Sequence, residues 1–172
     1  MGETQFFRAS AGIAIVDDRG RVLAFERRDV PGAWQLPQGG IEVGEEPEQT
    51  ARRELWEETS IGWSAVRLLG EHPRWLAYEL PADARSAKTG RGQAQKWFVV
   101  TLSDDGPEID VTKIAQHQAD PEFRTFRWMT FEELLSKAAG FRAPEYEELA
   151  DYVRSLKSGC DLRAEPDEGS LP

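Results

Sequence analysis

Short apolar runs alternate with polar segments in the N-terminal part of the chain. Ala11–Val16 and Val22–Phe25 are two such runs, and Asp17–Gly20 separates them. Apolar runs of this length, joined by a segment rich in Asp and Gly, predict the two strands of a β-hairpin. Trp34–Leu36, which stands directly before Pro37, predicts a third short strand.

The pattern changes from strand-like to helical at Pro47. Pro47–Thr59 places Ala51 and Leu55 one helical turn apart, and a proline suits the first turn of a helix. The same periodicity predicts two more helices near the C-terminal end, at Phe131–Ala138 and Glu145–Leu156.

Four further segments predict strands, and one of them, Lys96–Leu102, is rich in β-branched and aromatic residues, which favour a strand. They are Arg67–Leu69, Trp75–Leu80, Lys96–Leu102 and Phe126–Met129. Strands and helices are mixed without the regular alternation of a doubly wound sheet. The order therefore predicts an α+β fold, with a mixed sheet between layers of helices.

The chain length of 172 residues favours one domain, which we expect to span residues 1–157. Residues 158–172 are rich in glycine, proline and acid and predict a flexible tail. Pro81–Gln95 is polar and contains glycines, so it predicts a long loop that is either mobile or functional.

Composition narrows the class of protein. The chain is 40% hydrophobic and 30% charged, as soluble globular proteins are, and its formal net charge is −10. That charge argues against the capture of double-stranded DNA by a basic surface, but it allows a phosphate ligand whose charge is met by a metal. The single cysteine forms no internal disulfide, and no apolar run indicates a signal peptide or a membrane span. We therefore expect a cytoplasmic protein without a membrane partner, and its oligomeric state is not indicated.

Three glutamates are crowded near the end of the first predicted helix. At about 100° per residue, Glu54, Glu57 and Glu58 share one helix face with Thr50. Arg53 can pair with Glu57, but one arginine does not neutralise three carboxylates. Acidic helix faces are most often simply solvated. The alternative is a site for a divalent cation such as Mg²⁺, which prefers carboxylate oxygens.

The segment before the helix gives this cluster a more specific context. Gly39 is followed after five residues by Glu45, and after seven more by Arg53–Ile61. This spacing resembles the Nudix box, Gx5Ex7REUxEExGU, in which U is apolar. Every specified position matches except Ser60, where the pattern has glycine. A left-handed residue at that position costs a non-glycine residue about 1 kcal/mol, and Gly62 could instead shift the helix cap by two residues.

The resemblance implies an α/β/α sandwich that hydrolyses a nucleoside diphosphate linked to another group, with Mg²⁺ or Mn²⁺ as cofactor. By position, Glu54, Glu57 and Glu58 would hold the metal, with a carbonyl group of Gly39 or its neighbour. Glu45 would support the junction between loop and helix, and Arg53 would orient a glutamate. Among these carboxylates, Glu54 is our first choice for the base that removes a proton from water, and Glu58 belongs to the same catalytic group.

Three other segments resemble the bacterial RNA 5′-pyrophosphohydrolases and the similar diadenosine polyphosphate hydrolases. They are Trp34–Gly40, Gly92–Phe98 and Pro121–Trp128. In that branch, the position of Glu122 implies a further metal ligand, which competes with Glu54 for the role of base. Without the resemblance, Glu122 would be interpreted as an exposed acid in a loop.

The resemblance implies a Mg²⁺-dependent pyrophosphohydrolase that acts on 5′-triphosphate RNA or on a dinucleoside polyphosphate such as diadenosine tetraphosphate. A damaged nucleoside triphosphate or a nucleotide sugar is the alternative substrate. A nucleotide sensor without catalytic activity is a third hypothesis, but it is disfavoured because all three box carboxylates are present.

The candidate substrate-binding residues have a basic, amide or phenol side chain, or a glycine backbone that a phosphate can approach. They are Arg28, Gln38, Gly40, Tyr78, Lys88, Arg91 and Lys96. The loop that carries Lys88 and Arg91 could close over the distal phosphates, or it could simply be solvated.

Other residues are weaker candidates for contact with substrate. Arg8 and Arg27 lie at strand ends, where arginines are more often only solvated. Trp34 and Trp97 could stack on a base, and Gln95 could bind the ligand through its amide. Phe98 is expected in the core, as aromatic residues in strands usually are.

Overall fold

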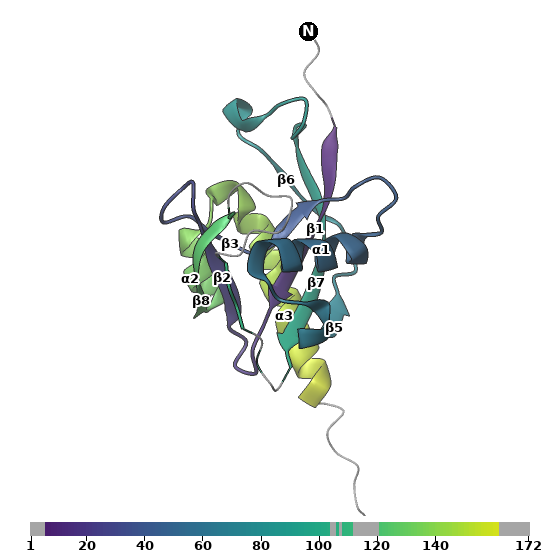
Figure 1. The fold of residues 1–172 in the computed structure, drawn as a ribbon, viewed down its shortest axis with the longest axis vertical. Helices are drawn as coiled ribbons and strands as arrows, with labels where there is room; N and C mark the ends of the chain where they lie inside the picture. The colour runs from purple at the N-terminus through teal and green to yellow at the C-terminus, as the bar shows by residue number, and fades with distance from the viewer. Residues whose placement is uncertain (1–5, 104–105, 107, 112–120, 162–172) are drawn as a thin grey trace, which may run out of the picture.

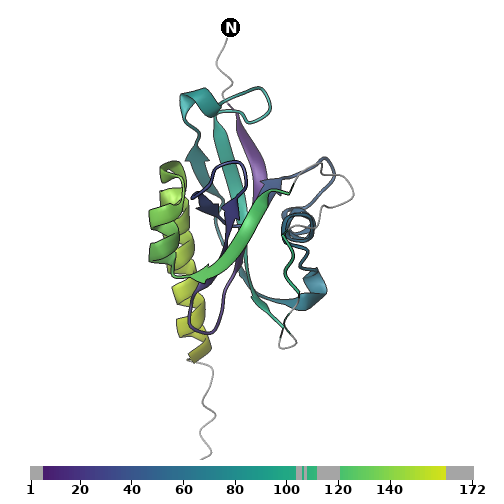
Figure 2. The same ribbon diagram turned by 60° about the vertical axis from the view of Figure 1, so that its left-hand side comes forward.

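The computed structural model describes residues 6–103, 106, 108–111 and 121–161. Its strands lie between two helical layers, which Figures 1 and 2 show from two directions. Helix α1 (Pro47–Thr59) covers one face, and α2 (Phe131–Lys137) and α3 (Ala143–Asp161) cover the other. The predicted α+β class, with helices on both sides of mixed strands, is confirmed.

The larger sheet has five strands in the described residues, and one parallel pair is at its centre. Strands β1 (Phe7–Ile15) and β7 (Gly92–Leu102) run parallel over nine residue pairs, from Phe7 with Gly92 to Ile15 with Val100. Strand β4 (Gln38–Gly40) pairs with the free edge of β1. Strands β5 (Val66–Glu71) and β6 (Leu76–Glu79) both pair with β7, and all these pairings are antiparallel.

A second sheet contains the strand that follows Asp17–Gly20 along the chain, together with two other strands. Its order is β3 (Trp34–Gln35), β2 (Val22–Arg27) and β8 (Phe123–Met129), and both pairings are antiparallel. Short 3₁₀ turns at Trp63–Ala65 (η1), Ala82–Ala84 (η2) and Gly140–Arg142 (η3) complete the described elements. No helix in these ranges is both long and apolar enough to cross a lipid bilayer.

The strands are apolar on both faces because each face packs under helices. Along β1, Ile13 and Ile15 point toward α1, whereas Ala14 points toward α2 and α3. The same alternation in β7 places Phe98 in the α1 core and Trp97 in the other core. Successive side chains of a strand point to opposite faces, so one strand contributes to two cores.

The predicted hairpin is wrong beyond its turn. Gly20 donates its backbone N–H to Asp17 at 3.0 Å, and Val16 and Val22 form an isolated antiparallel bridge. Beyond that bridge, β1 and β2 enter different sheets. The edges of β1 are occupied by β4 and β7, which supply the hydrogen bonds that a hairpin partner would have made.

Three other boundaries also differ from the sequence prediction. Gln38–Gly40 forms β4, a strand that the sequence did not predict, because Ser10–Gly12 of β1 offers a free edge. The predicted loop ends earlier than Gln95, since β7 begins at Gly92. Helix α3 extends to Asp161, so residues 158–161 are helical, and the rest of the predicted tail lies outside the described residues.

Helix α1 has the predicted bounds, and both of its ends are held by local hydrogen bonds. At the start, the Glu46 backbone N–H donates to Oε1 of Gln49 at 2.8 Å. At the end, Ser60 adopts a left-handed conformation with φ of 61°, and its hydroxyl donates to the carbonyl oxygen of Asp110 at 2.9 Å. The cap therefore stays at Ser60 and does not shift to Gly62.

Candidate active site

Helix α1 turns its acidic face toward β4 because its apolar residues pack on the sheet. Ala51 and Leu55 are fully buried in the core between α1 and the strands. This orientation also buries Glu54 and Glu58, whose exposed fractions are 8% and 7%. Glu57 lies farther toward solvent and is half-buried. The glutamate face is therefore an internal surface next to β4, not a solvated one.

Strand β4 approaches this face through its backbone. The Gln38 backbone N–H donates to Oε2 of Glu58 at 3.0 Å. A Cβ atom built on Gly39 would lie 1.9 Å from Oε1 of Glu54, far inside van der Waals contact. A side chain at residue 39 would displace either the Glu54 carboxylate or β4, so glycine allows the observed approach of the backbone to this carboxylate.

Arg53 connects the acidic face to the loop that precedes α1. Its Nε and Nη2 donate to the two carboxylate oxygens of Glu45 at 2.7 and 2.9 Å. Nη1 donates to Glu54 at 2.6 Å and more weakly to Glu57 at 3.3 Å, and Nη2 also donates to the Gly40 carbonyl oxygen at 3.0 Å. The predicted pairing of Arg53 with Glu57 is confirmed, but Glu45 is its main partner.

Burial and the repulsion between carboxylates make Glu54 and Glu58 resist ionisation. Burial is the largest cause that raises the pKa of Glu58 well above its usual value, and the charges of Glu54 and Glu122 raise it further. Burial also raises the pKa of Glu54, although Arg53 opposes this effect. A cation bound between such groups would remove both the repulsion and the desolvation cost.

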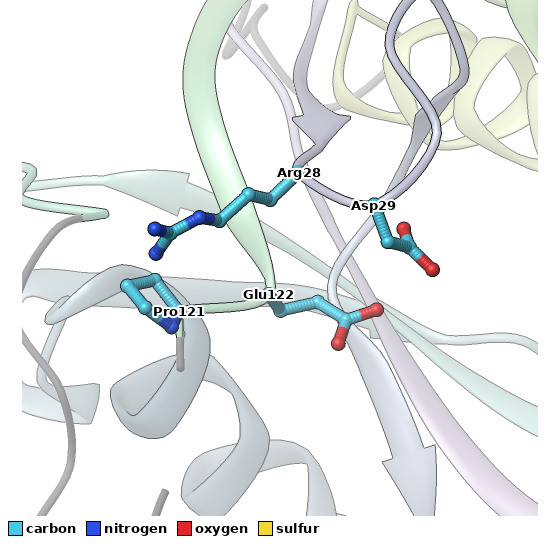
Figure 3. Close-up of a pocket in the computed structure, with 4 residues that line it drawn as sticks. All are labelled: Arg28, Asp29, Pro121 and Glu122. Carbon is cyan, nitrogen blue, oxygen red and sulfur yellow. The ribbon is translucent and has the colours of Figure 1, made fainter. Parts of the chain in front are cut away.

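Glu122 belongs to the same site, although it lies far from α1 in the sequence. Its charge acts on Glu58, and its carbonyl oxygen accepts the Arg28 backbone N–H at 3.0 Å. Arg28, Asp29, Pro121 and Glu122 line an open pocket of about 440 Å³. In Figure 3, the Arg28 guanidinium extends over Pro121, whereas the carboxylate of Glu122 points to the opposite side.

The donor chemistry of this site fits a hard divalent cation. Such a cation takes carboxylate and backbone oxygens, and Glu54 and Glu58 lie against the backbone of β4 at Gly39 and Gln38, with Glu57 on the same helix. In the described part of the chain, no three acidic, histidine or cysteine side chains already converge on one point. Arg53 binds Oε1 of Glu54 and Oε2 of Glu57, which leaves the other oxygen of each carboxylate for a cation.

Two arginines lie near β4 and the Glu122 pocket, Arg8 on the face of β4 opposite to Glu54 and Arg28 at the pocket. The Arg8 guanidinium packs against Gly40, where a Cβ atom would lie 2.1 Å from its Nη2. Arg28 is exposed at the pocket. Neither guanidinium has an ion-pair partner within the described residues, in contrast to Arg27, which pairs with Asp29 at 2.6 Å. Arg28, which lines the pocket together with Glu122, is therefore a candidate to meet a phosphate.

The loop candidates are arranged differently. Arg91 pairs with Glu79 at 2.7 Å, and Lys96 is mostly buried and pairs with Glu71 at 3.0 Å. Lys88 is exposed on the loop that contains η2, which both ribbon views place beyond the end of the sheet and away from α1. A phosphate-binding role for Lys88, Arg91 and Lys96 stays a prediction.

Most of the aromatic and amide candidates are buried. Trp97, Phe98 and Gln95 are at most 1% exposed, so Phe98 is a core residue as predicted and the other two do not face a ligand. Tyr78 is also buried, and its hydroxyl lacks a hydrogen-bond partner in the described structure. Only Trp34 keeps a partly exposed ring, which the Arg127 guanidinium covers at 5.3 Å.

Sequence reasoning missed two buried charged residues behind β4. Arg142 and Glu145 are 6% and 2% exposed, and the charge of Arg142 acts on both Glu145 and Glu58. The signal was present in the sequence, because Glu145 lies one position before Tyr146 on the apolar face of α3. A charged residue beside the apolar stripe of an amphipathic helix is a candidate for a buried polar contact.

The Glu45–Arg53 pair predicts a pH-dependent contribution to stability. The hydrogen bonds from Arg53 lower the pKa of Glu45 from 4.5 to about 2. A depressed pKa stabilises the fold above the unfolded value near 4.5, and this contribution is lost as pH falls toward about 2. Because the pair is partly solvated, we expect Glu45→Gln to lower the free energy of unfolding by about 1–2 kcal/mol at pH 7.

Urea denaturation of both proteins at several pH values measures this difference. The difference in the free energy of unfolding between wild type and Glu45→Gln should decrease as pH is lowered from neutrality toward about 3. A gap that is constant with pH would show that the pair does not stabilise the fold through its charge.

Comparisons with known proteins agree with the geometry of the site. A family model described as "NUDIX domain" matches residues 6–151. The chain is 39% identical over 150 residues to Nudix hydrolase 25 of Arabidopsis thaliana, with 83% of each chain covered. It is 40% identical over 146 residues to the RNA pyrophosphohydrolase of Rhodospirillum rubrum, which covers 83% of this chain and 84% of the relative.

Solved structures support the fold alone. The Escherichia coli dihydroneopterin triphosphate pyrophosphohydrolase superposes with a TM-score of 0.65 at 22% identity, covering 86% of this chain and 99% of that protein. At this identity, the likeness identifies the architecture and not the substrate.

Proposed function

The chain belongs to the Nudix family of hydrolases, and from this premise we propose that it removes pyrophosphate from the 5′-triphosphate end of RNA, with Mg²⁺ as cofactor. The observation that carries the proposal is the buried pair Glu54 and Glu58, set against a backbone that only glycine allows to come so close. Mn²⁺ is the alternative metal, because both ions take oxygen ligands.

Glu54, Glu57 and Glu58, Glu122 and a carbonyl group at Gly39 would hold the metal in this proposal. When bound, Mg²⁺ neutralises charge on phosphate oxygens and lowers the pKa of a bound water. The first role of the chain is to keep these carboxylates on one internal face through the packing of Ala51 and Leu55.

Proton transfer is the second role of the chain. A carboxylate must accept the proton of the attacking water, and its pKa must not lie far below neutrality for this to be efficient. Burial raises the pKa of Glu54, which supports it as the base. Arg53 holds Oε1 of Glu54 at 2.6 Å and would fix the direction of the other carboxylate oxygen. Glu122, at the open pocket, is the competing candidate.

Charge at the pocket supports a polyphosphate substrate. Arg28 adds an unpaired positive charge at the pocket that Glu122 lines, in a chain whose net charge is −10. The relative in Rhodospirillum rubrum, named as an RNA pyrophosphohydrolase, supports RNA as the group that follows the triphosphate. A dinucleoside polyphosphate presents the same phosphate chemistry and is the alternative that an assay must separate.

The direct test compares two substrates under the same conditions. Purified protein with Mg²⁺ is given 5′-triphosphate RNA in one reaction and diadenosine tetraphosphate in another, and product release is measured. The proposal expects faster release of pyrophosphate from RNA. Faster cleavage of the dinucleotide to ATP and AMP would reject RNA as the main substrate. If neither is cleaved, a wider panel of nucleoside diphosphate derivatives becomes the relevant test.

Arg28 should contribute to substrate binding more than to the chemical step. Removing one charged hydrogen bond to a phosphate costs about 1.5 kcal/mol, so Arg28→Ala should raise KM about tenfold with little change in kcat. Steady-state kinetics on the preferred substrate measures both constants. The matched control is Arg124→Ala, which removes an exposed arginine that pairs with Glu26 at 3.2 Å. Equal KM values for the two variants would contradict a role for Arg28.

A further inference from the structure

The backbone crosses from the smaller sheet to the larger one at Leu36 and Pro37. These two residues lie between β3 and β4, and neither belongs to a strand. Proline has no N–H group to donate, and the carbonyl oxygen of Pro37 accepts the backbone N–H of Ile13 at 3.0 Å. The N–H of Leu36 is therefore the backbone donor that this crossing must satisfy outside the strand ladders.

A phenol from helix α3 accepts this donor. The backbone N–H of Leu36 donates to the hydroxyl oxygen of Tyr146 at 3.1 Å, across 110 positions of the chain. Both residues are fully buried, so water cannot replace the phenol as the acceptor. Because a buried backbone N–H needs a partner, the Tyr146 hydroxyl holds the backbone at the point where it turns toward β4.

The ring of the same tyrosine supports the strand that pairs with β4. It packs edge-on against Trp97, with 6.0 Å between the ring centroids. The Trp97 indole in turn lies against Gly12 of β1, where a Cβ atom would be 2.5 Å from the indole ring. Gly12 pairs with Gln38 in the ladder between β1 and β4. Tyr146 therefore supports the start of β4 both through its hydroxyl and through its ring.

The contacts of β4 with the glutamates begin immediately after this crossing. The backbone N–H of Gln38 donates to Oε2 of Glu58 at 3.0 Å, and Gly39 lies against the carboxylate of Glu54. Only Pro37 separates Leu36 from Gln38, and the ring of proline fixes its φ angle. A displacement of Leu36 is therefore carried to the backbone that faces the glutamates.

We propose that Tyr146 is a positioning residue for the glutamate site. Its hydroxyl group, through the backbone N–H of Leu36, holds β4 at the distance from α1 at which the β4 backbone, Glu54 and Glu58 can share a metal ion. Tyr146 belongs to α3, in the helical layer on the opposite side of the strands from α1 (Figure 2), so it acts without touching metal or substrate. The inference rests on the proposed function, since it gives Tyr146 an effect on metal binding and hydrolysis.

Nuclear magnetic resonance of ¹⁵N-labelled protein tests the link without any catalytic step. Tyr146→Phe removes the hydroxyl and keeps the ring that packs on Trp97. The matched control is Tyr152→Phe, the same change in the same helix, where the hydroxyl donates to the carbonyl oxygen of Glu71 at 2.8 Å. In Tyr146→Phe, the Leu36 N–H should exchange with solvent at least about tenfold faster than in the control, and the Gln38 N–H resonance should shift. Equal exchange rates and unshifted resonances in the two variants would overturn the proposal.

Metal binding and kinetics then test whether the displacement reaches the glutamates. Tyr146→Phe should bind Mn²⁺ about tenfold more weakly than wild type and lower kcat about tenfold, with KM unchanged, whereas Tyr152→Phe should match wild type in all three. A hydrogen bond that only stabilises the fold would lower the melting temperature and leave the Mn²⁺ affinity as it is. Equal Mn²⁺ affinity and equal kcat in the two variants would therefore overturn the positioning role. If wild type cleaves no substrate, the proposed function fails, and Mn²⁺ binding with hydrogen exchange still decides the role of Tyr146.

Discussion

Glu58→Gln should lower kcat by about 10³-fold, which corresponds to about 4 kcal/mol at 1.36 kcal/mol per tenfold. The glutamine keeps the size of the side chain and can still accept the Gln38 N–H, but it removes the charge that a cation would need. Because Glu58 is nearly inaccessible to water, solvent cannot replace the lost ligand without opening the site.

The folded state of this variant should be intact or more stable without metal. Burial and the charges of Glu54 and Glu122 disfavour the ionised form of Glu58, so a neutral side chain removes a cost of folding. Thermal unfolding in the presence of a chelator measures this, and single-turnover kinetics measures the chemical step. Glu48→Gln is the matched control, because it removes an exposed acid of the same helix that pairs with Arg52. A kcat of Glu58→Gln within about fivefold of the kcat of the control would contradict a role for Glu58 in catalysis.

Gly39→Ala should lower kcat about 100-fold while the protein still folds. The new methyl group would lie 1.9 Å from Oε1 of Glu54, so either the carboxylate or β4 must move. A displacement of about 1 Å in an active site can reduce turnover by this factor. Steady-state kinetics and circular dichroism on the same preparation separate the loss of activity from a loss of structure.

The Gly44→Ala variant separates the effect of the close approach of β4 to Glu54 from the effect of backbone strain. Gly44 has a φ of 87° and open space around the position of a Cβ atom, so alanine there should cost stability without touching the glutamates. For Gly44→Ala, we expect a lower melting temperature and a kcat near that of wild type. For Gly39→Ala, we expect a lower kcat and a melting temperature near that of wild type. Full activity of Gly39→Ala would show that the approach of β4 to Glu54 is not needed for catalysis.

Local signals were sufficient to predict α1 and its acidic face. Pro47 indicates the start of the helix, and the spacing of Ala51 and Leu55 decides which side packs on the sheet. That choice also places the glutamates, because side chains three and four residues apart share a helix face. The sequence left the end of the helix open between Ser60 and Gly62, and the left-handed conformation of Ser60 decides between them.

Long-range pairing was not predictable from local patterns. β4 contains two glycines and no apolar side chain, so only the free edge of β1 makes it a strand. The predicted hairpin of β1 and β2 does not form for the same reason. Strand β7, which lies far along the chain, pairs with β1 where β2 was expected. The buried hydrogen bond from Trp97 to Glu145 joins residues 48 positions apart, and no spacing rule connects them.

Metal binding by the glutamate face is the central claim, and Mn²⁺ titration followed by electron paramagnetic resonance tests it most directly. Free Mn²⁺ gives a sharp signal that is lost on binding, and Mg²⁺ should restore it by competition. We expect wild type and Glu48→Gln to bind with the same affinity, and Glu58→Gln to bind at least about tenfold more weakly. Equal binding by all three proteins, or none by wild type, would contradict a metal site formed by α1 and β4.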